Sequence, residues 1–243
     1  MRPWHNPRIV LKELALGVVV LLSYLGVSAL SQGRADLAIS HAEQLISLER
    51  SLGIFVEPAL QGAVGVGLWA WILSEFYLLA HPLITLGFIV GLFVSGRGEY
   101  PRVRNLLVTF SLLSFAIYLL YPAAPPRMVP ESGMNDLVEG SGTVDYERGV
   151  MKYLMRLVDP YAAMPSVHFG YSLIVGGFFL LALRRKPMRI LGPAYPAVML
   201  VSVAATGNHF LVDCLASVLV VSISKVVADR ASSFATFDAR GGL

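Results

Sequence analysis

Two short polar segments of the chain carry residue types that could do chemistry together. PSVH, at residues 165–168, contributes Ser166 and His168, and NHFLVD, at residues 208–213, contributes His209 and Asp213. His209 and Asp213 are four residues apart, so on one helix they share a face and the carboxylate can hold one imidazole nitrogen. The other nitrogen is then available as a base or nucleophile. The alternative is a buried pair that only satisfies its own hydrogen bonds.

The residues around His168 and Arg127 add groups that favour a phosphate. Pro165 suits a first helical position, and the following amides with the Ser166 hydroxyl form an anion cradle at the positive end of a helix dipole. Arg127 follows a stiff Pro-Pro pair and offers a planar fork for phosphate oxygens. The simpler alternatives are a structural role for His168 and a lipid-headgroup anchor for Arg127. Taken together, the groups predict metal-independent phosphoryl transfer that needs no cofactor.

The composition shows what kind of molecule must position these groups. Of the 243 residues, 56% are hydrophobic and 14% are charged, and the mean hydropathy is +0.66. Soluble domains carry about 25% charged residues. We therefore expect an all-α, polytopic membrane bundle, with room for about six spans of roughly 20 residues each. The single cysteine, Cys214, excludes an intramolecular disulfide and a thiolate cluster.

Six apolar runs without Lys or Arg are the candidate spans. They are 14–30, 62–95, 106–121, 167–183, 190–206 and 210–224. The loops 97–104 and 184–189, the N-terminus and the tail from Lys225 hold most of the 19 Lys and Arg residues, which assigns them to the cytoplasm. The net charge of +3 is explained by these loops, and no basic groove indicates nucleic-acid binding.

The direction of the spans follows from these loops. Because residues 97–104 lie inside, the run 62–95 crosses once, and we expect the crossing at 76–95. The preceding GAVGVGLWAWILSE, with Trp69 and Trp71, is then re-entrant or interfacial. Six crossings result, both termini are cytoplasmic, and the first apolar run is retained as a span. This places Arg127, His168 and His209 together at the extracytoplasmic face, and we expect the membrane to be the plasma (inner) membrane.

Two longer segments on that side have helical periodicity. In residues 34–57 the apolar residues Ala38, Ala42, Leu45, Leu48 and Leu52 share one face, and residues 147–158 show a similar pattern. These amphipathic helices either cap the bundle or shape the access of a lipid from the outer leaflet. The expected organisation is a single domain: 1–61 for the first span and outer helix, 62–230 for the catalytic bundle, and 231–243 for a frayed tail.

PSVH and NHFLVD resemble the signature of the type 2 phosphatidic acid phosphatase superfamily, which pairs Pro-Ser-x-His with a later His-x-x-x-Asp. Two phosphate-binding cations of that superfamily are missing. Its first motif would have a lysine at Leu120 and a proline at Met128, and its third would have an arginine at Val203 after Ser202. YPAAPPR, TGNHFLVD and LERSLGIFVEPALQ (residues 48–61) are instead similar to the inositol phosphorylceramide synthase branch and its bacterial relatives.

The resemblance implies a membrane enzyme that acts on a lipid substrate. By position it implies His209 as nucleophile, Asp213 as its partner and His168 as the acid for the leaving group. Arg127 and Ser166 would be the phosphate ligands. Hydrolysis and headgroup transfer between lipids both stay open, because they differ only in whether water or an alcohol attacks a phosphohistidine.

Two rival classes use the same residue types. A transporter would place intramembrane ionisable residues along a pathway, and Glu75 and His81 could belong to one. It gives no reason for the Pro-Ser and Pro-Pro-Arg segments. A membrane zinc hydrolase would use His168, His209 and Asp213 as ligands. Full activity in the presence of a chelator would exclude it.

Overall fold

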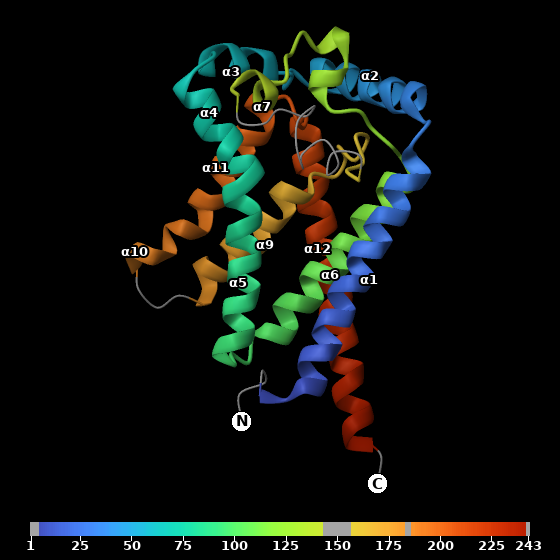
Figure 1. Ribbon diagram of the computed structural model, residues 1–243, viewed down its shortest axis with the longest axis vertical. Coiled ribbons are helices and arrows are strands. Elements are labelled where there is room, and N and C mark those ends of the chain that lie inside the picture. The colour runs from blue at the N-terminus through green and yellow to red at the C-terminus, as the bar shows by residue number, and fades with distance from the viewer. Residues whose placement is uncertain (1–4, 143–156, 183–185, 242–243) are drawn as a thin grey trace.

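The computed structural model is a bundle of helices covered at one end by a layer of shorter helices (Figure 1). It describes residues 5–142, 157–182 and 186–241. Within these ranges there is no strand, and one isolated parallel bridge joins Ala123 to Ala162. We call the covered end the capped end. Both termini lie at the opposite end, as an even number of crossings requires (Figure 1).

The bundle is built from long apolar helices and shorter ones between them. They are α1 (Pro7–Ser31), α4 (Leu68–Glu75), η2 (Phe76–Ala80), α5 (His81–Ser95), α6 (Tyr100–Leu120), α9 (Val167–Ala182), α10 (Lys186–Arg189), α11 (Leu191–Ala205) and α12 (Leu211–Gly241). Among the described residues, four continuous helices are long and apolar enough to cross a membrane: α1, the run Leu68–Ser95, α6 and the first part of α12. The apolar α9 and α11 are shorter. The predicted all-helical membrane bundle is thus confirmed, with four of the expected spans at full length.

The segment before residue 76 continues directly into the span, so the re-entrant alternative was wrong, while the interfacial alternative stays a prediction. Leu68–Ser95 is one helix of 28 residues. The chain breaks earlier, at Gly65 and Gly67, whose φ angles of 63° and 112° favour glycine. Pro82 has no N–H to donate, yet the helix continues through it. The π-helical turn Phe76–Ala80 just before Pro82 shifts the backbone pairing, and the His81 N–H donates to the Phe76 carbonyl.

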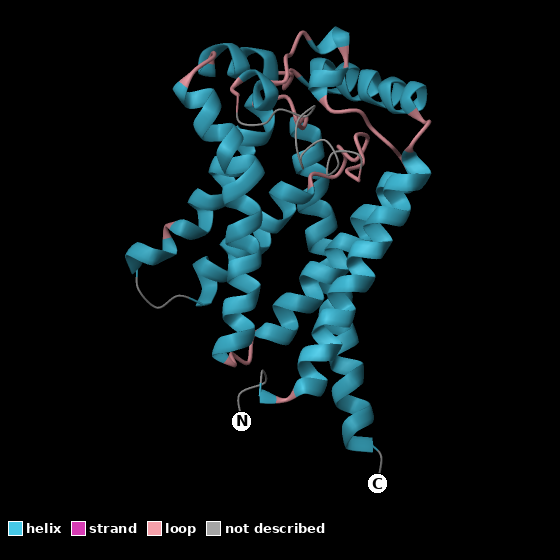
Figure 2. Cartoon of the chain, in the orientation of Figure 1, coloured by secondary structure: helices cyan, strands magenta, loops and turns pink. Residues whose placement is uncertain are grey.

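The capped end carries α2 (Ala35–Leu52), α3 (Glu57–Val64), η3 (Pro126–Met128), η4 (Pro130–Ser132) and α7 (Leu137–Gly140). The longer loops of the described chain also lie there (Figure 2). Helix α2 is the amphipathic helix predicted for residues 34–57, and it ends earlier, at Gly53 in the left-handed conformation. Its buried face is rotated from the predicted one: Leu48 and Leu52 are exposed, whereas Ile46 and Glu49 are buried. The helix predicted for 147–158 lies almost entirely outside the described residues.

Helix α9 packs very closely against α6 and α11 at two of its glycines. A Cβ on Gly170 would lie 2.0 Å from the Phe110 ring of α6, and one on Gly176 would lie 2.3 Å from the Gly192 carbonyl oxygen of α11. Small residues allow such contacts between helices of a membrane bundle. At the other end of the chain α12 stays helical to Gly241, where the sequence predicts a frayed tail, because the segment has no Pro and Gly241 is its first Gly.

Candidate active site

Three segments that are distant in sequence meet at the capped end of the bundle. The Ala123 N–H donates to the Tyr161 carbonyl (2.9 Å), and the Ala163 N–H donates back to the Ala123 carbonyl (3.2 Å). The Arg127 N–H donates to the Gly207 carbonyl (3.0 Å). These backbone bonds hold the YPAAPPR segment against the starts of α9 and α12. The structure therefore brings Arg127, His168 and His209 to one place, as predicted.

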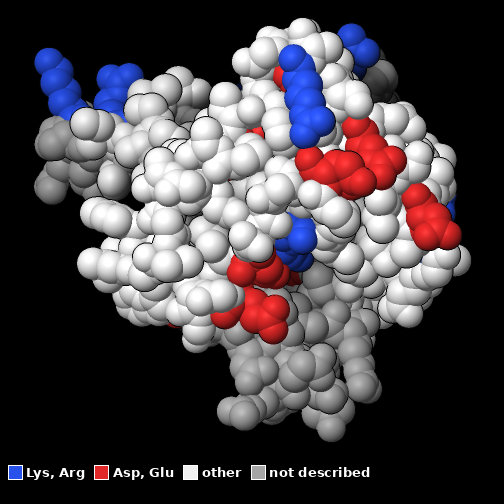
Figure 3. Space-filling model, turned by 90° about the horizontal axis from the view of Figure 1, so that it is seen from above, with Lys and Arg blue, Asp and Glu red and all other residues white. Residues whose placement is uncertain are grey.

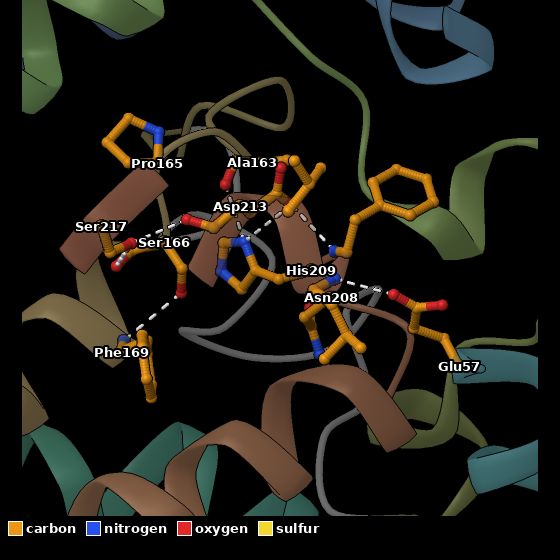
Figure 4. Close-up of polar contacts among 12 residues, drawn as sticks. Glu57, Ala163, Pro165, Ser166, Phe169, Asn208, His209, Asp213 and Ser217 are labelled. Carbon is orange, nitrogen blue, oxygen red and sulfur yellow. Dashed lines mark hydrogen bonds and ion pairs between the residues drawn. The ribbon is translucent and has the colours of Figure 1, made fainter. Parts of the chain in front are cut away.

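His209 is held with one ring nitrogen facing the protein. Its side chain is almost fully buried, and Nδ1 lies 2.8 Å from the Ala163 carbonyl oxygen (Figure 4). A carbonyl oxygen only accepts, so Nδ1 carries the proton and Nε2 keeps its lone pair. Burial lowers the pKa of His209 to about 3; the Ala163 carbonyl opposes this shift and Arg127 adds to it. The imidazole is therefore neutral at pH 7, which is the state a nucleophile needs.

Asp213 lies beside His209, although it is not the nearest acceptor for Nδ1. Its Oδ2 is 3.5 Å from Nδ1 and accepts the Phe210 N–H at 2.8 Å (Figure 4). Asp213 is fully buried, and its backbone carbonyl accepts the Ser166 N–H (3.2 Å). The predicted His209–Asp213 pair is thus within ion-pair distance, while the Ala163 carbonyl takes the orienting hydrogen bond.

His168 occupies the second position of α9, next to His209. The two ring centroids are 6.1 Å apart. Tyr77 and His81 flank the His168 ring from the other side, with centroid distances of 4.3 and 5.3 Å. Both come from the π-helical turn and the residue after it, and π-bulges are frequent at functional sites. The Nδ1 of His81 lies 2.7 Å from the Tyr195 hydroxyl, which fixes that ring in turn.

A cavity of about 330 Å³ opens between these groups. It is lined by Tyr24, Tyr77, Phe115, Tyr118, Pro125, Arg127, Val158, Asp159, Pro160, Ala162, Ala163, Val167, His168, Tyr171, Asn208 and His209. Arg127 is the one Lys or Arg of the described residues in this lining. Its Nε is 2.9 Å from Asp136 Oδ2, and its Nη1 donates to the Asn208 side-chain oxygen. The guanidinium is therefore oriented before any ligand binds.

Ser166 supports the start of α9 and does not line the cavity. It is fully buried, and its Oγ accepts the Phe169 N–H at 3.3 Å (Figure 4). Its carbonyl accepts the Ser217 hydroxyl of α12 at 2.8 Å. This arrangement is that of a helix cap, which fixes the turn that carries His168. A role of Ser166 as a phosphate ligand stays a prediction.

The positions where the superfamily's cations are missing lie away from the cavity lining. Leu120 and Met128 are exposed, and Val203 is fully buried among apolar residues. Within the described residues, no group of three or more His, Cys, Asp or Glu is arranged to hold a metal ion. Seen from the capped end, the acidic and basic side chains of the described residues lie interspersed, without an extended patch of one sign among them (Figure 3).

Several residues of the site escaped the sequence analysis. Asn208 was visible only as the neighbour of His209, and nothing in the sequence singled out Asp136 or Tyr77. Their roles depend on tertiary contacts: Asp136 caps α7 through the Val138 and Glu139 amides and pairs with Arg127. His81 was noted as an intramembrane ionisable residue, and its position against His168 gives it a place in this site.

The apolar helices define an integral membrane protein, and its cavity at one end of the bundle is lined by His168, His209 and Arg127 among mostly apolar and aromatic residues. The chain belongs to the PAP2 superfamily, whose family model matches residues 43–227. It is also similar to the phosphoinositol dihydroceramide synthase of Bacteroides thetaiotaomicron, with 26% identity over 191 residues. That match covers 70% of this chain and 61% of the relative's length. No solved structure matches the chain significantly. The superfamily that the two motifs indicated is thus confirmed, as is the branch that YPAAPPR, TGNHFLVD and residues 48–61 indicated.

Proposed function

We propose that the protein transfers a phosphate-linked headgroup of a membrane lipid through a phosphohistidine formed on His209. The observation that carries the proposal is the orientation of His209: its Nδ1 is engaged by the Ala163 carbonyl, so Nε2 is the nucleophilic atom in a cavity shared with His168 and Arg127. Membership of the PAP2 superfamily supports lipid phosphate chemistry, and the synthase relative supports transfer between lipids.

In the first half-reaction, Nε2 of His209 attacks the phosphorus of the donor lipid. A P–N bond forms while the P–O bond to the lipid alcohol breaks, and His168 gives the departing oxygen a proton. The imidazole of His209 becomes cationic. The Ala163 carbonyl and the Asp213 carboxyl group stabilise it at 2.8 and 3.5 Å. Arg127 offsets the charge that develops on the non-bridging oxygens.

In the second half-reaction, His168 takes a proton from the acceptor hydroxyl, which attacks the phosphorus. The P–N bond breaks and its electron pair returns to Nε2. A lipid alcohol as acceptor gives a new headgroup-bearing lipid, and water gives the free headgroup phosphate. Both outcomes regenerate the protonation states of His168 and His209 from which the cycle started.

The charge of the cavity favours a phosphodiester over a phosphate monoester as donor. A diester phosphate carries one negative charge, whereas a monoester approaches two. Among the described residues of the cavity lining, Arg127 is the one permanent cation, and Asp136 already offsets part of its charge. A monoanion matches this site better, and a diester is also the donor that headgroup transfer requires. We therefore place transfer ahead of simple hydrolysis.

The experiment that tests the proposal traps the intermediate. The purified protein is mixed with a phosphatidylinositol labelled with ³²P and quenched in base, and dihydroceramide is added in a parallel reaction. We expect acid-labile, base-stable label on the wild-type protein and none on His209→Ala. His41→Gln is the matched control, since His41 lies outside the cavity lining and should leave the label unchanged. Equal labelling of His209→Ala and the wild-type protein would refute the assignment.

The same proposal includes the orientation of the protein in the membrane. The basic loops 97–104 and 184–189 indicate cytoplasmic connections, and both termini lie at the end opposite the site (Figure 1). We infer that the site opens on the extracytoplasmic face and that the donor and acceptor lipids come from the outer leaflet.

A further inference from the structure

Two glutamates of the capping helices reach the beginning of α12, the helix that follows His209. Glu49 of α2 and Glu57 of α3 are both fully buried. The Oε1 of Glu57 accepts the Leu211 N–H at 2.7 Å (Figure 4), and the Oε1 of Glu49 accepts the Val212 N–H at 2.7 Å. Asp213 takes the Phe210 N–H in the same way. Three carboxyl groups therefore cap three consecutive amides that have no partner within the helix.

The second oxygen of each of these carboxyl groups is left without a donor. Glu49 Oε2, Glu57 Oε2 and Asp213 Oδ1 are buried and accept no hydrogen bond from a described residue. Two arginines of the capped end are engaged elsewhere: Arg50 donates to the Glu131 carbonyl, and Arg127 pairs with Asp136. Three ionised carboxylates in one buried site would repel one another strongly. At least one proton must therefore stay in the cluster.

The geometry also indicates where that proton lies. Burial raises the pKa of Glu49 to about 8, and although the Val212 amide lowers it, a side-chain hydrogen bond with Glu57 raises it further. Glu57 and Glu49 accept the adjacent amides of Leu211 and Val212, so their two carboxyl groups lie side by side at the start of α12. A protonated Glu49 would supply the donor that the second oxygen of Glu57 lacks.

We propose that Glu49 and Glu57 share one proton and act as a hydrogen-bonded pair that positions the first turn of α12, and with it His209 and Asp213, for attack on phosphorus. The inference rests on the proposed function. Neither residue lines the cavity, so both are positioning residues and do not touch the substrate. The shared proton also limits the negative charge behind the nucleophile, where a phosphate anion must approach.

Amide substitutions test the sharing of the proton directly. In Glu49→Gln or Glu57→Gln, the side-chain oxygen still accepts its backbone N–H and the new NH₂ group donates to the remaining carboxylate. Each single variant should keep kcat within about threefold of wild type. In the double variant the two NH₂ groups face each other, so one amide must turn and abandon its backbone partner. We expect kcat to fall by about tenfold to a hundredfold, the equivalent of one strong hydrogen bond, with KM little changed.

A matched control separates positioning from stability. Gln61 lies on α3 and is also mostly buried, but its hydrogen bonds go to Asn135 and to the Ala205 carbonyl, not to α12. Gln61→Ala should lower the melting temperature in detergent with little loss of kcat. The double glutamine variant should show the reverse: a large loss of kcat and of phosphohistidine formation, with a smaller loss of melting temperature.

An infrared measurement tests the pair without any catalysis. In wild-type protein labelled with ¹³C at the glutamate side-chain carboxyl, we expect the band of a protonated carboxylic acid at neutral pH, shifted by the label. The band should be absent from both single variants. Absence of the band in wild type, inactivity of either single variant, or a fully active double variant would each overturn the inference. If the double variant does not fold, the activities of the single variants and the infrared band still test the shared proton. The band does not depend on whether His209 is the nucleophile.

Discussion

Replacing Gly170 by alanine should shift His168 without touching any polar group of the site. A Cβ at this position would meet three atoms of the Phe110 ring, at 2.0, 2.6 and 2.8 Å. Phe110 is fully buried and packs edge-on against Tyr171, so its ring has little room to move. Ordinary contact begins at 3.4 Å, so α9 and α6 must separate by about 1.4 Å at this level.

The expected loss is larger in rate than in stability. Overpacking a well-packed core costs roughly 1–3 kcal/mol, and the better helix propensity of alanine returns about 0.5–1 kcal/mol of it. His168 precedes Gly170 by two residues on the same turn of α9. A displacement of about 1 Å at a catalytic group can lower a rate by about 100-fold. We therefore expect Gly170→Ala to fold with a lowered melting temperature and to lose roughly two orders of magnitude in kcat.

Gly177 of the same helix provides the control. A Cβ there would meet nothing within 4 Å. Gly177→Ala should leave the rate unchanged and stabilise the protein slightly. Adding Phe110→Leu to Gly170→Ala removes the obstructing ring atoms and should restore most of the lost rate, although Phe110→Leu alone is destabilising. The assay is headgroup transfer in detergent, followed together with thermal unfolding.

Two results would refute this reasoning. If Gly170→Ala is as active and as stable as Gly177→Ala, the contact between α9 and α6 does not set the position of His168. If Gly170→Ala is inactive but Phe110→Leu gives no rescue, the loss does not arise from the Phe110 ring.

Three further predictions concern the other groups of the site. His168→Ala should lose much more rate on an alkyl phosphate ester than on an activated aryl ester, because only a poor leaving group needs the proton; equal losses would show that His168 is not the acid. Asn208→Ala removes a partner that orients Arg127, so it should raise KM by about tenfold with a smaller effect on kcat, which initial rates over a range of donor concentrations will measure. In a background that lacks the native cysteine, an impermeant thiol reagent applied to intact cells should label a cysteine placed at Ser141 and spare one at Ser232. The opposite pattern would place the site on the cytoplasmic face.

The bundle and the meeting of the three candidate-site segments could be predicted from the sequence, because both follow from general constraints that do not depend on detailed packing. Apolar runs must form helices in a membrane because their backbone groups have no other partners. The span order then brings 121–127, 165–168 and 209 to one end, whatever the details of packing. The prediction failed at 62–75, where the basic-loop count fixed the number of crossings but not where the helix begins. Two glycines with positive φ decide that point.

What the sequence did not reveal depends on contacts between distant segments. The helical period of 34–57 identified an amphipathic helix from its apolar residues, and it did not single out Glu49. The structure turns this residue inward, because the amides at the start of α12 attract its carboxyl group. A pattern of apolar residues gives no reason to expect a buried carboxyl group, and only the tertiary partner of Glu49 explains its burial. The same holds for Asp136, whose partner Arg127 is nine residues away in the short helical turn η3.

The two helices that begin at the site, α9 and α12, differ in how many of their first amides are free to bind a ligand. At the start of α12 the Phe210, Leu211 and Val212 amides are occupied by Asp213, Glu57 and Glu49, so this helix end has little positive potential left for a ligand. At the start of α9, Ser166 caps only the Phe169 amide, and Val167 and His168 line the cavity. In the proposed reaction, the phosphate would therefore bind at α9 and Arg127, while α12 and its carboxyl groups would hold His209 as the nucleophile. This division would keep a buried, neutral His209 close to an anion without also offering that anion a competing site on the same helix.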